Sequence, residues 1–171
     1  HDGLILNPDR EDAITPILRA LNDPKIKIYK DSGVYPLDKD HNLCVFSCFD
    51  EKGWVNVKPE KDKINIATFH GPVYGSETDE NWQLESTVKT SFFDEFDYVM
   101  LGDIHKQQFL SDTIAYCGST IQQNYGETAE KGFLFWGING KDFKAKYVQL
   151  TNTSPFITVS YVDSLDILQS E

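Results

Sequence analysis

Histidine and aspartate side chains come directly after two apolar stretches that the sequence predicts to be buried strands. His70 follows residues 64–69, and Asp103 and His105 follow residues 98–101. Open α/β sheets present ligands at the carboxyl ends of their strands, and the glycines beside these residues let a backbone or a ligand come close. Imidazole nitrogen and carboxylate oxygen together suit a divalent ion such as Mn²⁺, Fe²⁺ or Zn²⁺. The spacing therefore predicts a metal site that uses His70, Asp103 and His105.

Plainer explanations stay open for each of these residues taken alone. A single histidine is more often satisfied by one hydrogen bond than bound to a metal, and Asp103 and His105 also fit a turn and an exposed side chain. At the start of the chain His1 is followed directly by Asp2. This pair fits a proton donor whose ring is held by the adjacent acid, and it equally fits a chain end without function.

Short apolar and alternating runs predict many strands and few helices. One amphipathic helix is predicted within residues 7–22, where four apolar residues from Ile14 to Leu21 share a face and Pro16 fits the first turn. A second, short helix is predicted to begin at Ser91. Strands are predicted at residues 26–28, 43–49, 55–57, 64–69, 98–101, 113–116, 132–136, 143–150 and 156–162. This pattern favours a mixed α/β fold with sheets packed face to face.

Length and composition exclude several classes of protein. The chain has 171 residues, of which 40% are hydrophobic and 25% charged, enough apolar mass for one soluble domain rather than a disordered or fibrous chain. No apolar run approaches the roughly 18 residues of a membrane-spanning helix, and no leader is recognisable, so we expect no membrane contact and a cytoplasmic location. Cys44, Cys48 and Cys117 show no paired zinc spacing and are expected to be free thiols.

The net charge of −11 argues against a surface that coats nucleic acid, because such binding needs clustered lysine and arginine. It does not exclude an enzyme that meets phosphates through bound cations. No G-x-S-x-G motif supports a serine hydrolase, and neither a P-loop nor a G-x-G-x-x-G motif supports a nucleotide-binding fold.

Four segments, in this order, resemble the motifs of calcineurin-like metallophosphoesterases, and within them the SbcD-type nucleases that repair DNA double-strand breaks. The first three are His1-Asp2-Gly3, similar to the end of a G-N-H-D motif; Phe69-His70-Gly71, similar to the single-histidine motif; and residues 101–106, similar to G-H-x-H. The fourth runs from Ile114 through Gly118-Ser119, Gln122 and Gly126-Glu127 to Lys131-Gly132, and it resembles the nuclease branch more than generic phosphatases. Asp103 and Cys117 depart from the family, which usually has His and Pro at these positions.

The resemblance implies a fold of two packed mixed β-sheets flanked by helices, present here as a fragment because the family's earlier ligand motifs lie upstream of residue 1. Residues 1–155 would be the C-terminal portion of the catalytic domain, and residues 156–171 the last strand and the start of a linker.

The resemblance also implies a site and partners. Two divalent ions, with Mn²⁺ the first choice, would clamp a phosphodiester, with His70 and Asp103 on one ion and His105 on the other. His1 would stabilise the transition state or protonate the leaving oxygen, and Asp2 would orient it. The implied partners are DNA, an SbcC-type coiled-coil ATPase and a second copy in a homodimer, in the nucleoid or the cytoplasm of an infected cell. We expect the isolated chain to be inactive.

Two other functions stay open. One is a phosphodiesterase or phosphatase that acts on small substrates with the same fold. The other is a non-catalytic interaction module in which Asp103 records a degraded metal site.

Overall fold

The computed structural model describes residues 11–157 and residue 159, and within them the chain is a mixed α/β protein. Among these described residues, apolar and alternating segments form eight strands, one short α-helix and two 3₁₀ helices. In chain order these elements are α2 (Thr15–Leu21), β1 (Gly33–Pro36), β2 (His41–Phe46), η1 (Glu51–Asn56), β3 (Ile64–His70), η2 (Thr90–Phe93), β4 (Tyr98–Gly102), β5 (Gln108–Ser111), β6 (Ile114–Tyr116), β7 (Lys131–Asn139) and β8 (Asp142–Leu150).

The first six strands form one mixed sheet in the order β1-β2-β3-β4-β6-β5. The four central strands, β2, β3, β4 and β6, are parallel, and the edge strands β1 and β5 run antiparallel to their neighbours. Since the central strands are parallel, their carboxyl ends all open on the same edge of the sheet. The residues that follow β3, β4 and β6 are thereby brought together from distant parts of the sequence.

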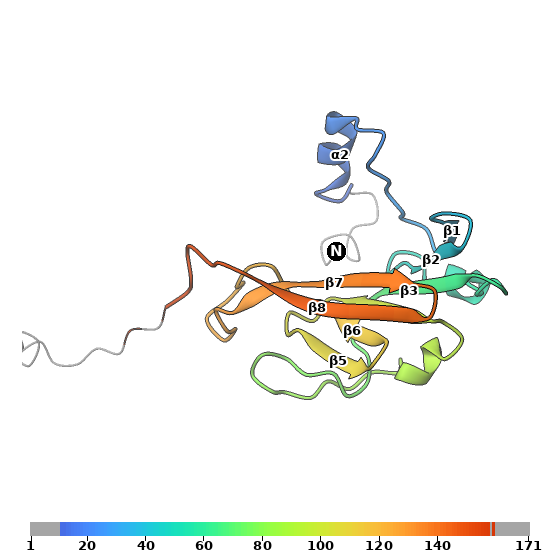
Figure 1. Ribbon diagram of the computed structural model, residues 1–171. Coiled ribbons are helices and arrows are strands. Elements are labelled where there is room, and N and C mark those ends of the chain that lie inside the picture. The colour runs from blue at the N-terminus through green and yellow to red at the C-terminus, as the bar shows by residue number, and fades with distance from the viewer. Residues whose placement is uncertain (1–10, 158, 160–171) are drawn as a thin grey trace, which may run out of the picture.

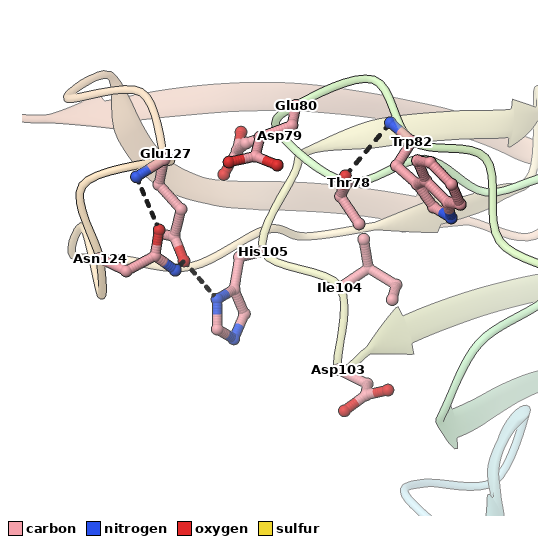
Figure 2. A pocket seen from close by; sticks show the side chains of 10 residues that line it. Thr78, Asp79, Glu80, Trp82, Asp103, Ile104, His105, Asn124 and Glu127 are labelled. Atoms are coloured by element: carbon pink, nitrogen blue, oxygen red, sulfur yellow. Dashed lines mark hydrogen bonds and ion pairs between the residues drawn. The ribbon is translucent and has the colours of Figure 1, made fainter.

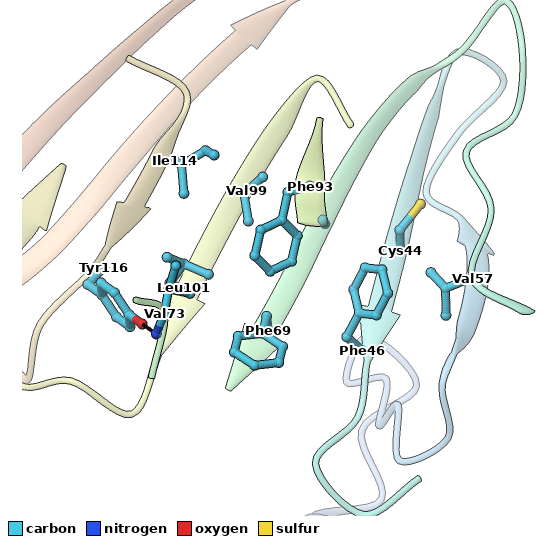
Figure 3. Packing of buried hydrophobic residues seen from close by; sticks show 11 residues of the cluster. Cys44, Phe46, Val57, Phe69, Val73, Phe93, Val99, Leu101, Ile114 and Tyr116 are labelled. Atoms are coloured by element: carbon cyan, nitrogen blue, oxygen red, sulfur yellow. Dashed lines mark hydrogen bonds between the residues drawn. The ribbon is translucent and has the colours of Figure 1, made fainter. Parts of the chain in front are cut away.

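One face of this sheet carries the hydrophobic core in two rows of paired side chains. Alternate residues of a strand share a face, and the register aligns these residues across four strands. The first row is Cys44, Ala67, Val99 and Ile114, and the second is Phe46, Phe69, Leu101 and Tyr116. All eight are buried. Phe93 from η2 and Val73 from the loop after β3 pack over them (Figure 3). This core fixes the positions of the strand ends.

The last two strands form a separate antiparallel hairpin that crosses the larger sheet, whereas α2 stands away from it (Figure 1). Tyr98 of β4 contacts Trp136 and Phe143 with ring centroids 6.3 and 5.1 Å apart, and its hydroxyl donates to the Gly140 carbonyl over 3.0 Å. The fold therefore has two packed sheets, as the sequence predicted. The second is a two-stranded antiparallel sheet rather than a mixed one.

Several predicted elements differ from the observed ones. Within the described part of residues 7–22, helix α2 spans Thr15–Leu21, and its first turn is closed by Asp12, whose carboxylate accepts the backbone N–H of Thr15 over 2.7 Å. Its apolar face is largely exposed, with Ile14 63% accessible. The hydrophobic pattern alone did not reveal that this face packs so little within the described part of the chain.

Three strand predictions are wrong or incomplete. Residues 26–28 are not in a strand. Residues 55 and 56 end the 3₁₀ helix η1, whose start Asp50 caps by accepting the backbone N–H of Gly53, and Val57 follows its last residue. The described part of residues 156–162 is not in a strand, and its other residues lie outside the described part. Ser91 lies in a 3₁₀ helix, and the short edge strands β1 and β5 were not predicted. No helix among the described residues is long and apolar enough to cross a membrane.

Candidate functional site

His70 and Asp103 meet at the carboxyl ends of the adjacent strands β3 and β4. His70 is the last residue of β3 and pairs with Gly102, the last residue of β4. The His70 Nε2 atom lies 3.5 Å from Asp103 Oδ1. The side chains are 44% and 27% exposed, so a ligand can reach both of them. Two of the three residues of the predicted metal site are therefore neighbours, and their binding of a metal stays a prediction.

Gly102 and the backbone of Asp103 make this approach possible. A Cβ atom on Gly102 would lie 2.9 Å from His70 Nδ1, so only glycine leaves room for the imidazole at this position. Asp103 has a φ of +89°, a conformation that costs a non-glycine residue free energy. Backbone strain of this kind is concentrated at functional sites, and here it turns the aspartate after β4 toward the end of β3.

The loop after His70 is held by a buried phenol from β6. The Tyr116 hydroxyl donates to the Gly71 carbonyl and accepts the backbone N–H of Val73, each over 2.8 Å. Tyr116 has no exposed surface, and burial raises the pKa of its hydroxyl. The phenol therefore stays neutral and fixes the turn that begins at His70.

His105 is oriented by a buried carboxylate. Its Nδ1 atom lies 2.8 Å from Glu127 Oε1, and Figure 2 shows the ring turned toward Glu127 and Asn124. The Glu127 side chain is 6% exposed and also accepts the Asn124 amide and the Gln123 backbone N–H. Because a carboxylate can only accept, a neutral His105 carries its proton on Nδ1 and presents the Nε2 lone pair. A histidine held in this way is the usual arrangement of a metal-ligating imidazole and its outer partner.

Lys131 holds the carboxylate in turn. Its ammonium lies 3.0 Å from Glu127 Oε2, 2.6 Å from Asp79 Oδ2 and 3.3 Å from the His105 carbonyl. The side chains of Lys131 and Asp79 are 3% and 9% exposed. We refer to Asp79, His105, Glu127 and Lys131 as the ion network. It joins three separate segments of the chain around one imidazole.

The segment after β6 holds the loop that carries His105 through backbone hydrogen bonds. Gly118 has a φ of +77°, and a Cβ there would lie 3.0 Å from the Gln107 backbone nitrogen, so this turn requires glycine. The backbone N–H of Ser119 then donates to the His105 carbonyl, and that of Gly132 donates to the Ser119 carbonyl. The glycine-bearing stretch therefore shapes the loop that carries His105.

Two neighbouring clefts open at this edge of the sheet. A cleft of about 760 Å³ is lined by His70, Asp103, His105, Cys117, Ser119 and Gln123, among others. A second cleft, of about 420 Å³, contains Trp82, Asp103, His105 and Glu127 in its wall. Asp103 and His105 border both clefts. A substrate in either one could contact both side chains.

The three predicted ligands share one cleft but do not converge on one ion-sized point. Among the described residues there is no group of three His, Cys, Asp or Glu side chains that could hold a metal ion. The donor separation of His70 and Asp103 nevertheless fits two positions on one ion, because two donors about 2.1 Å from a tetrahedral ion are about 3.4 Å apart. His105 stays a candidate ligand for a second ion. His1 and Asp2, the predicted catalytic residues, lie outside the described residues.

Sequence reasoning missed the roles of Asp79, Glu127 and Lys131. Gly126-Glu127 and Lys131-Gly132 were recognised as part of a motif, but the partner of each charge could not be read from its position. Asp79 lies in a polar loop in which no sequence pattern predicted a buried ion pair. Cys44, Cys48 and Cys117 are free thiols, as predicted.

Fold and site together define a mixed α/β protein with a histidine and carboxylate cleft at the carboxyl edge of its sheet. No protein-family profile matches the sequence. The chain is similar to the uncharacterized protein R555 of Acanthamoeba polyphaga mimivirus, with 31% identity over 177 aligned positions. The similarity covers 95% of this chain, which spans only 13% of the length of that protein.

Proposed function

We propose that this chain forms part of the catalytic domain of a metal-dependent DNA nuclease of the SbcD type, on a calcineurin-like fold. The observation that carries the proposal is the pairing of His70 with Asp103 across two parallel strand ends, in the same cleft as a His105 that a buried glutamate orients. Ion pairs placed for stability alone do not need the strained backbone of Asp103.

Each residue has a defined task in this proposal. His70 and Asp103 bind one divalent cation, and the Nε2 atom of His105 binds a second. Such ions, when bound, stabilise the attacking and leaving oxygens of a phosphodiester and activate water at neutral pH. Glu127 keeps the His105 lone pair directed outward, and Lys131 neutralises Glu127 so that the carboxylate stays ionised in its buried position. For His1 and Asp2 we retain the proposed roles in proton donation and ring orientation.

The charge of the protein is consistent with this chemistry. A chain with a net charge of −11 repels DNA phosphates unless cations stand between them. Bound divalent ions are the largest local charges in such a site and reverse the field there. For the whole protein we propose a homodimer that works with an SbcC-type ATPase in the nucleoid or cytoplasm.

The test is cleavage of linear duplex DNA by the full-length protein with Mn²⁺, compared with cleavage of a small chromogenic phosphodiester. We expect His70→Ala, Asp103→Asn and His105→Ala to lower the Mn²⁺-dependent rate by more than about 100-fold, and Glu127→Gln by about 10- to 100-fold. His41→Ala is the matched control, because His41 begins β2 at the opposite edge of the sheet.

Other outcomes lead to the alternatives. Hydrolysis of the small phosphodiester without DNA cleavage would favour a small-substrate phosphodiesterase. Absence of Mn²⁺ binding in calorimetry of the full-length protein would favour a non-catalytic module. The isolated 171 residues should show no nuclease activity, and clear Mn²⁺-dependent cleavage by them would contradict that expectation.

A further inference from the structure

The outward face of the β7–β8 hairpin carries two exposed aromatic rings. In an antiparallel pair, directly opposite residues share a face, and the register places Phe133 opposite Val148 and Phe135 opposite Lys146. Trp136, which follows Phe135, belongs to the other face and packs against Tyr98 of the larger sheet. Phe133 and Phe135 therefore point away from the core, with 38% and 60% of their surface exposed.

Lysines lie beside Phe135, on the neighbouring strand and in the turn. Lys144 and Lys146 lie on β8 on the same outward face, and Lys141 lies in the connecting turn; all three are exposed. None of the three lysines forms an ion pair with another residue in the described part of the chain. Between residues 141 and 146 they face a single acidic residue in the sequence, Asp142. We refer to Phe133, Phe135, Lys144 and Lys146 as the hairpin platform. It is a locally cationic surface on a chain whose net charge is −11.

The platform is flat beside Phe135. Gly137 follows on the same face, opposite Lys144, and a Cβ placed on it would meet no atom closer than 3.9 Å. The position next to Phe135 on this face of β7 therefore carries no side chain. Alternate residues on a strand are about 7 Å apart, so the two rings offer separate stacking positions rather than one closed aromatic pair.

We propose that the hairpin platform binds single-stranded nucleic acid, with unpaired bases stacked on Phe133 and Phe135 and backbone phosphates beside Lys144 and Lys146. Aromatic side chains at exposed sheet positions stack bases of any sequence, and nearby cations track the phosphates. Paired bases do not present their faces, so duplex DNA binds less well. An apolar protein partner would leave the lysine charges buried and unpaired, which is costly.

This binding goes beyond the proposed nuclease function because it needs neither a metal ion nor cleavage. The platform lies on the second sheet, whereas His70 and Asp103 lie at the edge of the first. The two proposals can therefore fail separately.

The experiment measures fluorescence anisotropy of labelled 15-nucleotide oligothymidine and oligouridine with the full-length protein in EDTA. We expect Phe135→Ala to weaken binding of at least one strand by about 5- to 150-fold. Joint replacement of Lys144 and Lys146 by glutamine should reduce the slope of log K against log salt by about 1.4. Phe49→Ala and a Lys39→Gln, Lys61→Gln double variant are controls, because these residues are exposed elsewhere.

Three results would overturn the proposal: no binding of either strand at low salt, equal affinity of wild type and Phe135→Ala, or tighter binding of a matched duplex. Sedimentation of the wild type and of Phe135→Ala tests whether a second copy of the chain covers the hairpin platform instead. A dimer that Phe135→Ala dissociates, together with absent oligonucleotide binding, would assign the platform to contact between copies. Oligonucleotide binding in a protein without nuclease activity would support this proposal and contradict the previous one.

Discussion

Replacing Lys131 with methionine should destabilise the protein more than almost any other single charge removal. The lysine, Asp79 and Glu127 side chains are all less than 10% exposed, and their contacts are 2.6 and 3.0 Å long. Removing one partner of a buried ion pair leaves the other charge unpaired and costs about 3 to 5 kcal/mol. Here two carboxylates lose their shared cation. We expect the free energy of unfolding to fall by that amount at pH 7, or about 6 to 20 °C in melting temperature.

The pH dependence identifies the cause. Burial lowers the pKa of Lys131, but its bonds to Asp79 and Glu127 raise it more, so the net pKa lies above 10.5. Its stabilising effect is therefore complete at neutral pH and is lost only as pH rises through that higher value. Burial raises the pKa of Glu127, yet bonds from His105, Gln123 and Lys131 lower it below 4.5 overall. The stability that Glu127 contributes is present above pH 4.5 and disappears as pH falls through its lowered pKa.

Urea unfolding followed by tryptophan fluorescence from pH 4 to 8 measures how the loss of stability in Lys131→Met depends on pH. In Lys131→Met the Glu127 carboxylate loses one of the groups that lower its pKa, so the deficit should shrink below about pH 5. Lys131→Met combined with Asp79→Asn should recover more than about 1 kcal/mol, because one unpaired charge is gone. Lys52→Met, on the exposed side of η1, should change stability by less than about 0.5 kcal/mol. A Lys131→Met deficit below about 1 kcal/mol at pH 7, or one that is unchanged at pH 4.5, would refute the reasoning.

Three further outcomes follow from the contacts. Gly102→Ala should displace the His70 ring and shift its ¹⁵N resonances, because the new Cβ would lie 2.9 Å from Nδ1; unchanged resonances would contradict this contact. Tyr116→Phe should lower the free energy of unfolding in urea by about 1 to 3 kcal/mol, since the buried N–H of Val73 and the partly buried carbonyl of Gly71 lose their partner. Burial raises the pKa of Cys44 to about 11, so this fully buried thiol should resist iodoacetamide at pH 8 until urea unfolds the chain, while the exposed Cys117 is alkylated first.

The sequence predicted the parts of the site that depend on strand position. Residues 64–69 and 98–101 are continuous apolar runs, which indicate buried parallel strands, and a residue at the end of such a strand has a fixed place in the sheet. His70 and Asp103 could be predicted to meet for that reason. The antiparallel strand β5 could not be predicted in this way, because it has four residues at an edge of the sheet and only two of them are apolar.

The ion network depends on contacts that no local pattern encodes. Asp79 and Lys131 each lie in segments rich in polar residues, where a charge is ordinarily solvated. Their burial follows from the way three loops pack at the carboxyl edge of the sheet. The prediction for residues 55–57 failed for a similar reason. Their alternating valines indicate a strand, but Asp50 caps a 3₁₀ helix that includes the first two of these residues.

The long chain separation within the ion network determines when the cleft forms during folding. The bond between Lys131 and Asp79 joins residues 52 apart, and that between Glu127 and His105 joins residues 22 apart. Closing loops of this length costs entropy that is repaid only after the parallel strands have paired, and such pairing is slow. His105 therefore gains its fixed orientation late. A molecule that opens locally would lose the orientation of His105 while most of its sheet hydrogen bonds still protect their amides from exchange.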